Sequence, residues 1–258
     1  MQRTTLLPLL GLTGLLAACG GSSTDASSTT SSSATVVVEP VIDPGDGGDY
    51  GPVIDPAEFV DVIDNPYLPL TAGSRWVYEG DDGNGLERIE VVVTGDRRQV
   101  MGVSTWIVQD TVTVDGVVVE DTFDYFAQDR EGNVWYFGED SREFEDGVAV
   151  NAEGSWEGGI DGALPGIAMP ADPRVGDSYR QEFDPGNAED LGEILDVGVS
   201  RATATADHTD VVVTEDWSPL APEIVEEKWY ARGVGNVRST HTAGETGTVE
   251  LVEFTPGV

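Results

Sequence analysis

A succession of short strand-like segments, with turn residues between them, constrains the fold of this chain most. Val, Ile, Thr and aromatic residues dominate Leu86–Thr94, Ser104–Val114, Val117–Gln128 and Val134–Glu139. Similar segments follow at 178–183, 193–204, 209–216, 223–231, 236–242 and 247–254. Helical spacing of apolar residues occurs only weakly, around 188–195. The sequence therefore predicts an all-β fold, an antiparallel meander forming a strongly curved sheet or barrel with at most one short helix.

One Gly- and Pro-rich stretch, Glu153–Gly176, interrupts these segments. It has eight glycines and prolines between Gly154 and Pro173, and it predicts a long ordered loop or lid. Trp156 lies in this stretch, where a large aromatic side chain either plugs a barrel or lines an opening.

The first residues predict export and a lipid anchor. A short basic start precedes an apolar run, 6–16, that is too short for a mature membrane-spanning helix. Leu16-Ala17-Ala18-Cys19 closes this run and holds the only cysteine of the chain. These residues resemble a bacterial lipobox, which implies acylation of Cys19, a covalent membrane anchor and placement at the outer membrane or cell surface. An ordinary secretory signal with an incidental cysteine is the alternative.

Composition after the leader separates a tether from a domain. Residues 20–35 hold no large apolar side chain, and acidic Pro-rich sequence follows, with Pro-Val-Ile-Asp-Pro at 40–44 and again at 52–56. We therefore divide the chain into a signal peptide (1–18), a lipid-anchored tether (19–60) and a single β-rich domain (61–258).

The net charge of −35 excludes some classes of partner. So acidic a surface repels nucleic acid and anionic lipid headgroups, whereas cations are attracted. A solvated surface that keeps an exported protein soluble explains the same charge. The expected partners are thus the membrane, through Cys19, and an unknown ligand or envelope component.

Three motifs of the domain together resemble those of a family of bacterial secreted lipoproteins. They are Asn65-Pro66-x-x-Pro69-Leu70-x-x-Gly73-x-x-Trp76-x-Tyr78, then Asn133-Val134-Trp135-Tyr136-Phe137-Gly138-Glu139-Asp140 after the Asp115-Gly116 turn, and Trp229-Tyr230-Ala231-x-Gly233-Val234-Gly235-x-Val237. The resemblance implies export and a β-rich domain, and it supplies no reaction. Arg232 stands where the family pattern has Pro, so the resemblance does not fix that turn.

Asp115-Gly116 is a preferred two-residue hairpin turn, and it predicts a pair of carboxylates. An unbroken register places Asp110 opposite Asp121 on the more apolar face, and the next hairpin places Glu139 opposite Phe123, near both. Two buried like charges must share a proton, bind a cation or meet an arginine. These three residues are therefore candidate catalytic residues of a hydrolase. A β-bulge that turns one aspartate to solvent, an open barrel mouth, or a salt bridge to Arg180 or Arg238 is the structural alternative.

The same register predicts a row of aromatic side chains, Trp106, Tyr125 and Phe137, joined by Trp76 and Trp229. Such a row is either core or a platform for a sugar, lipid or peptide. With Trp156, the first three are candidate ligand-binding residues.

Sharper motifs are absent from the sequence. His208 and His241 lack zinc-site spacing and are expected on the surface or in loops, and no nucleophile elbow or phosphate-binding loop occurs. Two Asp-rich turns, 81–85 and 129–133, have calcium ligand types without the EF-hand pattern. We expect no cofactor, with calcium as the one exception to test. The expected function is a non-enzymatic binding or envelope module; the alternatives are a polymer hydrolase and a carrier of hydrophobic molecules or lipids.

Overall fold

The computed structural model describes residues 50–81 and 85–258, and within them the protein is almost entirely β. The predicted leader, Cys19 and most of the tether lie outside these ranges. A single three-residue 3-10 turn, η1 (Pro56–Glu58), precedes the first strand. The described residues contain no helix long and apolar enough to cross a membrane.

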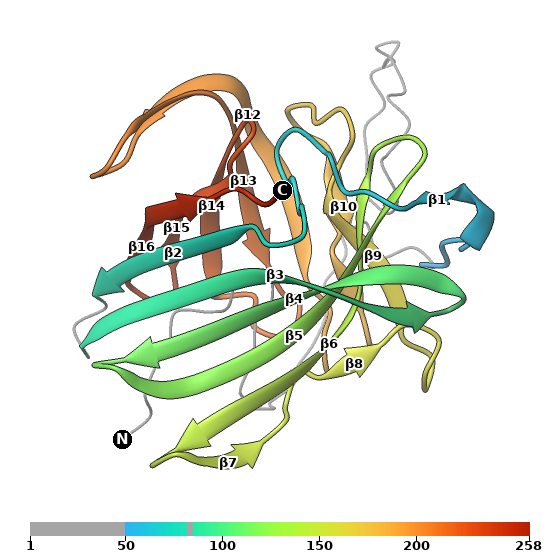
Figure 1. Ribbon diagram of the computed structural model, residues 1–258, viewed down its shortest axis with the longest axis horizontal. Coiled ribbons are helices and arrows are strands. Elements are labelled where there is room, and N and C mark those ends of the chain that lie inside the picture. Colours follow the sequence, from blue (N-terminus) through green and yellow to red (C-terminus); the bar gives the residue numbers. More distant parts are fainter. Residues whose placement is uncertain (1–49, 82–84) are drawn as a thin grey trace, which may run out of the picture.

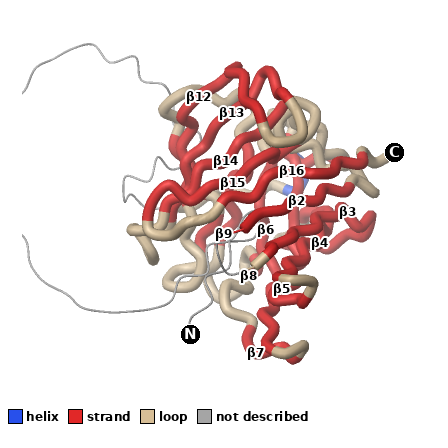
Figure 2. The backbone as a smooth tube through the Cα atoms, turned by 90° about the vertical axis from the view of Figure 1, so that its left-hand side faces the viewer, coloured by secondary structure: helices blue, strands red, loops and turns tan. Residues whose placement is uncertain are grey.

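Sixteen strands form one antiparallel sheet that curves into a nearly closed barrel, so the predicted fold class is confirmed (Figures 1 and 2). The strands are β1 (Phe59–Val60), β2 (Arg75–Asp81), β3 (Leu86–Val100), β4 (Val103–Val114), β5 (Val117–Asp129), β6 (Val134–Glu145), β7 (Val148–Asn151), β8 (Trp156–Glu157), β9 (Leu164–Met169), β10 (Ser178–Arg180), β11 (Glu182–Phe183), β12 (Leu191–Ala202), β13 (Asp207–Trp217), β14 (Val225–Ala231), β15 (Gly235–Ala243) and β16 (Thr248–Thr255). Consecutive strands pair from β2 to β6 and from β12 to β16, and β16 pairs with β2. The order is that of a meander.

The segment 178–183 joins the two ends of this sheet. Its first part, β10, pairs with β12, and its second part, β11, pairs with β9. Only Gln181 separates the two parts. Gly166 of β9 fits against this segment, because a Cβ atom there would lie 2.3 Å from the Gln181 carbonyl oxygen. The backbone of residues 180 and 181 therefore leaves no room for a side chain at position 166.

Two sequence expectations need correction here. The weak helical spacing at 188–195 belongs to a turn and to β12, because tertiary pairing overrides so faint a signal. The stretch 153–176 is only partly loop, since β8 and β9 lie within it and pair with β6. Its glycines permit close backbone approach, which composition alone reads as loop.

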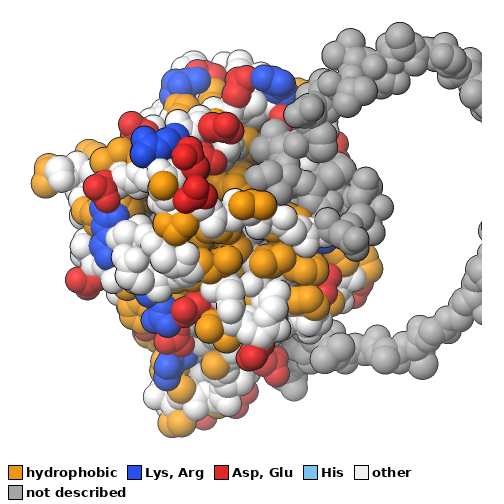
Figure 3. Space-filling view, turned by 90° about the vertical axis from the view of Figure 1, so that its right-hand side faces the viewer, with side chains coloured by type: hydrophobic (Ala, Val, Ile, Leu, Met, Phe, Trp, Pro, Cys, Tyr) orange, Lys and Arg blue, Asp and Glu red, His pale blue; other side chains and the backbone are white. Residues whose placement is uncertain are grey.

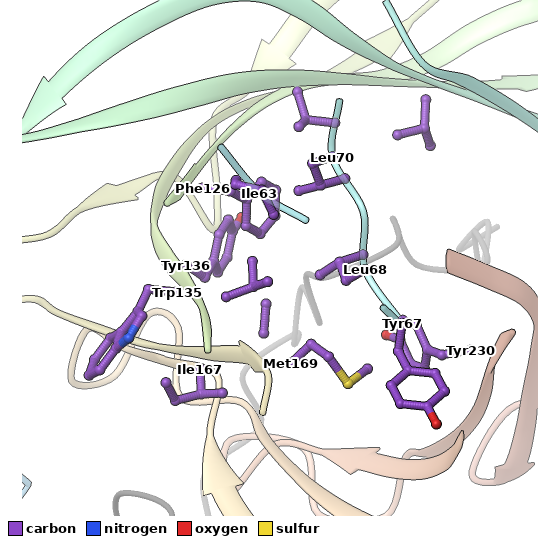
Figure 4. Close-up of a cluster of buried hydrophobic side chains, with 14 of the residues drawn as sticks. Ile63, Tyr67, Leu68, Leu70, Phe126, Trp135, Tyr136, Ile167, Met169 and Tyr230 are labelled. Carbon is purple, nitrogen blue, oxygen red and sulfur yellow. The ribbon is translucent and has the colours of Figure 1, made fainter. Parts of the chain in front are cut away.

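The entry segment, Ile63–Leu70, supplies much of the apolar core. Figure 4 shows it running between Phe126 and Tyr136 on one side and Tyr230 on the other. Asn65 holds its turn, since its side-chain oxygen accepts hydrogen bonds from the backbone N–H groups of residues 67 and 68, at 2.9 and 3.2 Å. The Asn-Pro pair of the entry motif is thus a turn that directs the following apolar side chains into the barrel.

The closing motif lies against this entry segment. The Gly233 N–H donates to the Pro66 carbonyl over 2.7 Å, and the Trp76 indole N–H donates to the Val234 carbonyl over 2.7 Å. Arg232 forms an ion pair with Asp210, and its guanidinium also donates to the Tyr67 hydroxyl. Arg232 therefore links the closing turn to β13 and the entry segment.

Ordered contacts begin upstream of residue 61. The Tyr50 hydroxyl donates to the Pro165 carbonyl over 2.6 Å, and its ring packs edge-on against Phe183 at 5.5 Å. β1 pairs with β5. The last residues assigned to the tether therefore lie on the barrel.

Candidate functional site

A β-bulge in β5 separates the two aspartates that the sequence suggested as a pair. The predicted two-residue turn forms, but Val119 is an extra residue between neighbouring cross-strand pairs. Asp110 therefore pairs with Thr122, and Asp121 pairs with Thr111. A shift of one residue turns every following side chain to the other face of the strand. The prediction that Asp110 faces Asp121 was wrong for this reason: Asp110 is buried inside the barrel, and Asp121 lies on the opposite face.

Glu139 also has a neighbour other than the predicted one. A second register shift, between Asp124 and Phe126, places Glu139 opposite Asp124 instead of Phe123. The hydroxyl oxygen of Tyr136 lies 2.7 Å from Asp124 Oδ1 and 2.7 Å from Glu139 Oε2. Each of the two acidic residues is 6% exposed. The interior thus holds a carboxyl pair, formed by different partners and bridged by a tyrosine.

Proton counting fixes the charge of this pair. The Tyr136 hydroxyl has one proton, so it donates to one carboxylate, and the other carboxyl must donate to the tyrosine oxygen. At least one of the two acids is therefore neutral. Burial raises the pKa of Asp124 to about 7, although the hydrogen bond from Tyr136 opposes this shift. Burial and then the adjacent Asp124 raise the pKa of Glu139 well above its usual range.

Other buried acids surround the pair. Burial raises the pKa of Glu120 to about 7, while a 3.1 Å hydrogen bond from the Thr122 hydroxyl favours its charged form. Glu182 accepts a 2.7 Å hydrogen bond from the indole N–H of Trp156, and burial followed by the charge of Asp190 raises its pKa well above normal. The inner face of this half of the barrel is an acid network that resists ionisation.

Sequence reasoning missed a second charged cluster, centred on Lys228, the only lysine of the chain. Its Nζ lies 2.9 Å from Asp216 Oδ2 and 3.3 Å from Glu226 Oε2. All three side chains are at most 7% exposed. Burial lowers the pKa of Lys228, but the two carboxylates outweigh it and hold this pKa well above the usual value. Alternation of Glu226, Lys228 and Tyr230 along one predicted strand was the signal available, because these side chains share a face.

The predicted aromatic row does not form one platform. Trp106 pairs with Phe126, so Tyr125 points to the opposite face. The Arg98 guanidinium lies 4.8 Å from the Tyr125 ring centre, and Phe137 packs edge-on against Phe59 of β1 at 5.4 Å.

Trp76, Trp229 and Trp156 lie apart from this row. Trp76 stacks on Phe254 at 5.3 Å, and Trp229 lies beneath Arg238 and Arg201. Trp156 points into the barrel, with its ring edge-on to Tyr136 at 5.5 Å. It occupies the interior rather than an opening.

Trp106 borders a cleft of about 320 Å³ between the entry segment and the sheet. The Arg97 guanidinium covers one side of its ring, 3.5 Å from the ring centre. The cleft is lined by Val62, Ile63, Asp64, Leu70, Thr71, Ala72, Trp106 and Val258. On the face of the molecule near β1, hydrophobic side chains gather centrally between charged ones (Figure 3).

Of the two Asp-rich turns considered for calcium, residues 82–84 of the first lie outside the described residues, and Asp129 of the second stabilises its own turn. Asp129 Oδ1 accepts hydrogen bonds from the backbone N–H groups of residues 131–133, and its Oδ2 accepts from the Trp135 indole. His241 is 8% exposed within β15, so it is neither a surface nor a loop residue, because its side chain faces the barrel interior. Within residues 50–81 and 85–258, no group of three or more His, Cys, Asp or Glu side chains is arranged to hold a metal ion.

Comparison with known proteins gives little further information. No family model and no curated protein match the chain. A crystal structure of a protein described as a lipoprotein, from Parabacteroides distasonis ATCC 8503, is 16% identical over 76% of this chain and 100% of its own, with a TM-score of 0.34. A likeness of this degree carries no argument about function.

Proposed function

We propose that this protein is a lipid-anchored component of the cell envelope whose β-barrel binds a small hydrophobic molecule without transforming it. The anchor is Cys19, supported by the Leu16-Ala17-Ala18-Cys19 motif and by the absence of any other cysteine in the chain. Gly20, rather than an aspartate, follows the cysteine, which favours the outer membrane or cell surface.

The apolar cleft beside Trp106 is the observation that carries the binding proposal. Its volume of about 320 Å³ suits a small ligand or part of an acyl chain. Five of its eight lining residues have aliphatic side chains, and a sixth is the tryptophan. The side chain of Asp64, its one acidic residue, accepts a 2.7 Å hydrogen bond from Gln128. A cleft of this composition attracts apolar groups.

The buried acids support binding over catalysis. Asp124 and Glu139 contact the Tyr136 hydroxyl, and neither residue lines the cleft. A hydrolase needs an acid and a base within hydrogen-bond reach of substrate. Here the pair is enclosed by side chains of its own barrel, so it acts as part of the core.

The anchor is tested by replacing Cys19 with alanine in the full chain. The unmodified protein should sediment with membranes and enter the detergent phase, whereas Cys19→Ala should not enter that phase. Detergent-phase partition of the variant equal to that of the unmodified protein would refute the lipid anchor.

The cleft is tested with a neutral fluorescent probe, N-phenyl-naphthylamine, which brightens in apolar surroundings. Trp106→Ala should weaken probe binding by about tenfold, the loss expected when roughly 1.4 kcal/mol of contact is removed. Trp229→Ala is the matched control, since Trp229 packs beneath two arginines elsewhere on the sheet. Equal binding by all three proteins would contradict the proposed site.

A further inference from the structure

The buried ion pair between Lys228 and Asp216 brings an amine and a carboxyl group into direct contact. These residues lie on adjacent strands, β14 and β13, and their side chains meet inside the barrel. The lysine Nζ is 2.9 Å from Asp216 Oδ2, and Glu226 Oε2 is 3.3 Å from the same nitrogen. An amine, a carboxyl carbon and a proton carrier are thus held together where little water reaches them.

We propose that Lys228 and Asp216 join in an intramolecular isopeptide bond, with Glu226 carrying the proton. This inference stands independently of the proposed ligand binding and lipid anchor.

The reaction balances without any co-reactant. Glu226 takes a proton from the Lys228 ammonium, and the neutral amine attacks Cγ of Asp216. The N–Cγ bond forms, one C–O bond of the Asp216 carboxyl breaks, and the oxygen leaves as water with two protons that came from the ammonium group, the first of them delivered by Glu226. An ammonium and a carboxylate become one amide and one water, so net charge is unchanged and nothing is oxidised or reduced.

The raised pKa of Lys228 opposes the loss of its proton, whereas the surroundings favour the other parts of this step. Asp216 Oδ1 accepts a 2.7 Å hydrogen bond from the Thr214 hydroxyl, and Oδ2 accepts a 3.2 Å hydrogen bond from the Gln181 amide, which polarises the carbonyl under attack. Burial raises the pKa of Glu226, which suits it to hold a proton temporarily. Fixing amine and carboxyl in contact replaces a bimolecular encounter with an intramolecular one.

The product also replaces buried charges by a neutral group. Burying an ammonium with two carboxylates has a large unfavourable desolvation free energy, whereas that of a neutral amide is much smaller. The domain has no cysteine, so a disulfide is not available to it. An isopeptide bond between β13 and β14 gives an exported domain a covalent link that withstands reducing conditions.

Peptide mapping of the denatured full-length protein tests the bond. Trypsin cuts after Lys and Arg, so a free Lys228 yields peptides 202–228 and 229–232. The bond predicts instead a single peptide, 202–232, lighter by one water, that stays joined after a glutamate-specific protease cuts between positions 216 and 228. Cleavage at Lys228, together with full labelling of its amine by a succinimidyl ester in denaturant, would overturn the proposal.

Variants of Lys228 and Glu226 test the role of each residue in forming the bond. Lys228→Arg keeps the positive charge and should lose the cross-link completely, and Glu226→Gln should lower its yield at least tenfold. Glu227→Gln is the matched control: this neighbour faces away from the triad and accepts a hydrogen bond from Trp229, so its cross-link should be complete. Undiminished cross-linking in Glu226→Gln would overturn the role of Glu226, and the map of the unmodified protein decides the bond even if a variant fails to fold.

Discussion

The hydroxyl of Tyr136 determines how the acids inside the barrel are charged. It contacts Asp124 and Glu139 equally closely but has one proton, so one of these acids stays neutral in the folded protein. In the unfolded chain both titrate near the usual values of about 4. The folded state therefore holds protons that the unfolded state releases between about pH 4 and pH 7.

This difference predicts that the protein loses stability as pH rises. The raised pKa values of Asp124 and Glu120, both about 7, mean that the folded state binds more protons than the unfolded state from about pH 4 to 7. The free energy of unfolding should fall across that window, by about 1.4 kcal/mol for each unit of pKa difference. Denaturant titrations at a series of pH values measure it.

Asp124→Asn should reduce this fall, because an amide keeps the hydrogen bond to Tyr136 and cannot ionise. Asp121→Asn, on the opposite face, is the control and should leave the slope unchanged. A slope in Asp124→Asn equal to that of the unmodified protein would show that the pair does not share a proton.

Replacing Tyr136 by phenylalanine tests the bridge itself. Loss of the hydroxyl leaves two buried carboxyl groups without their shared partner, which should cost about 1–3 kcal/mol of stability. The cost should be larger at pH 8 than at pH 5, because the charged forms need the hydroxyl more. A cost independent of pH would contradict the proton-sharing arrangement.

Individual site residues were predictable only in part. Carboxylates facing one another on this sheet were expected from the alternation along the hairpins, and such a pair exists. Its members differ because bulges at Val119 and near Tyr125 each shift the register by one residue. No turn residue marks the bulge at Val119, whereas the second bulge contains Gly138 of β6, whose φ of +136° is a conformation that favours glycine.

At the scale of elements, the contact between β9 and the segment 178–183 joins the two ends of the sheet. Gly166 lies against the backbone of Arg180 and Gln181, where a Cβ atom would overlap two carbonyl oxygens. The backbone cannot give way as a flexible side chain would. A single glycine thus permits β9 to meet the segment that carries β10 and β11.

Gly166→Ala should therefore destabilise the protein by about 2–4 kcal/mol, as overpacking against backbone does. Amide hydrogen exchange should increase first in β9–β11. Gly51→Ala, in open space, is the control and should change stability by less than about 0.5 kcal/mol. Unchanged stability and unchanged amide exchange of β9–β11 in Gly166→Ala would mean that the two ends of the sheet are not held together there.

Most strands were predictable because their signals are local. The long hairpins from β3 to β6 and from β12 to β16 combine β-branched residues with turn residues, and both kinds of signal agree. The short strands β7, β8 and β9 escaped prediction because they exist by pairing with β6. Composition alone cannot show a strand that depends on its partner.

At the scale of the whole molecule, an acidic barrel combines an apolar cleft with a densely hydrogen-bonded polar interior. The net charge of −35 over the whole chain favours a well-solvated surface. The cleft, bordered by Trp106, is where we propose that an apolar ligand binds. The anchor proposed at Cys19 would keep that cleft near a membrane, where hydrophobic molecules are concentrated.

Native mass spectrometry of the full-length protein, released gently from membranes, tests this account most directly. We predict a lipidated chain with an additional small hydrophobic molecule, which is lost in Trp106→Ala and retained in Trp229→Ala. A chain that carries no such molecule, or one that keeps it after Trp106→Ala, would contradict the claim that this protein binds hydrophobic ligands in the cleft beside Trp106.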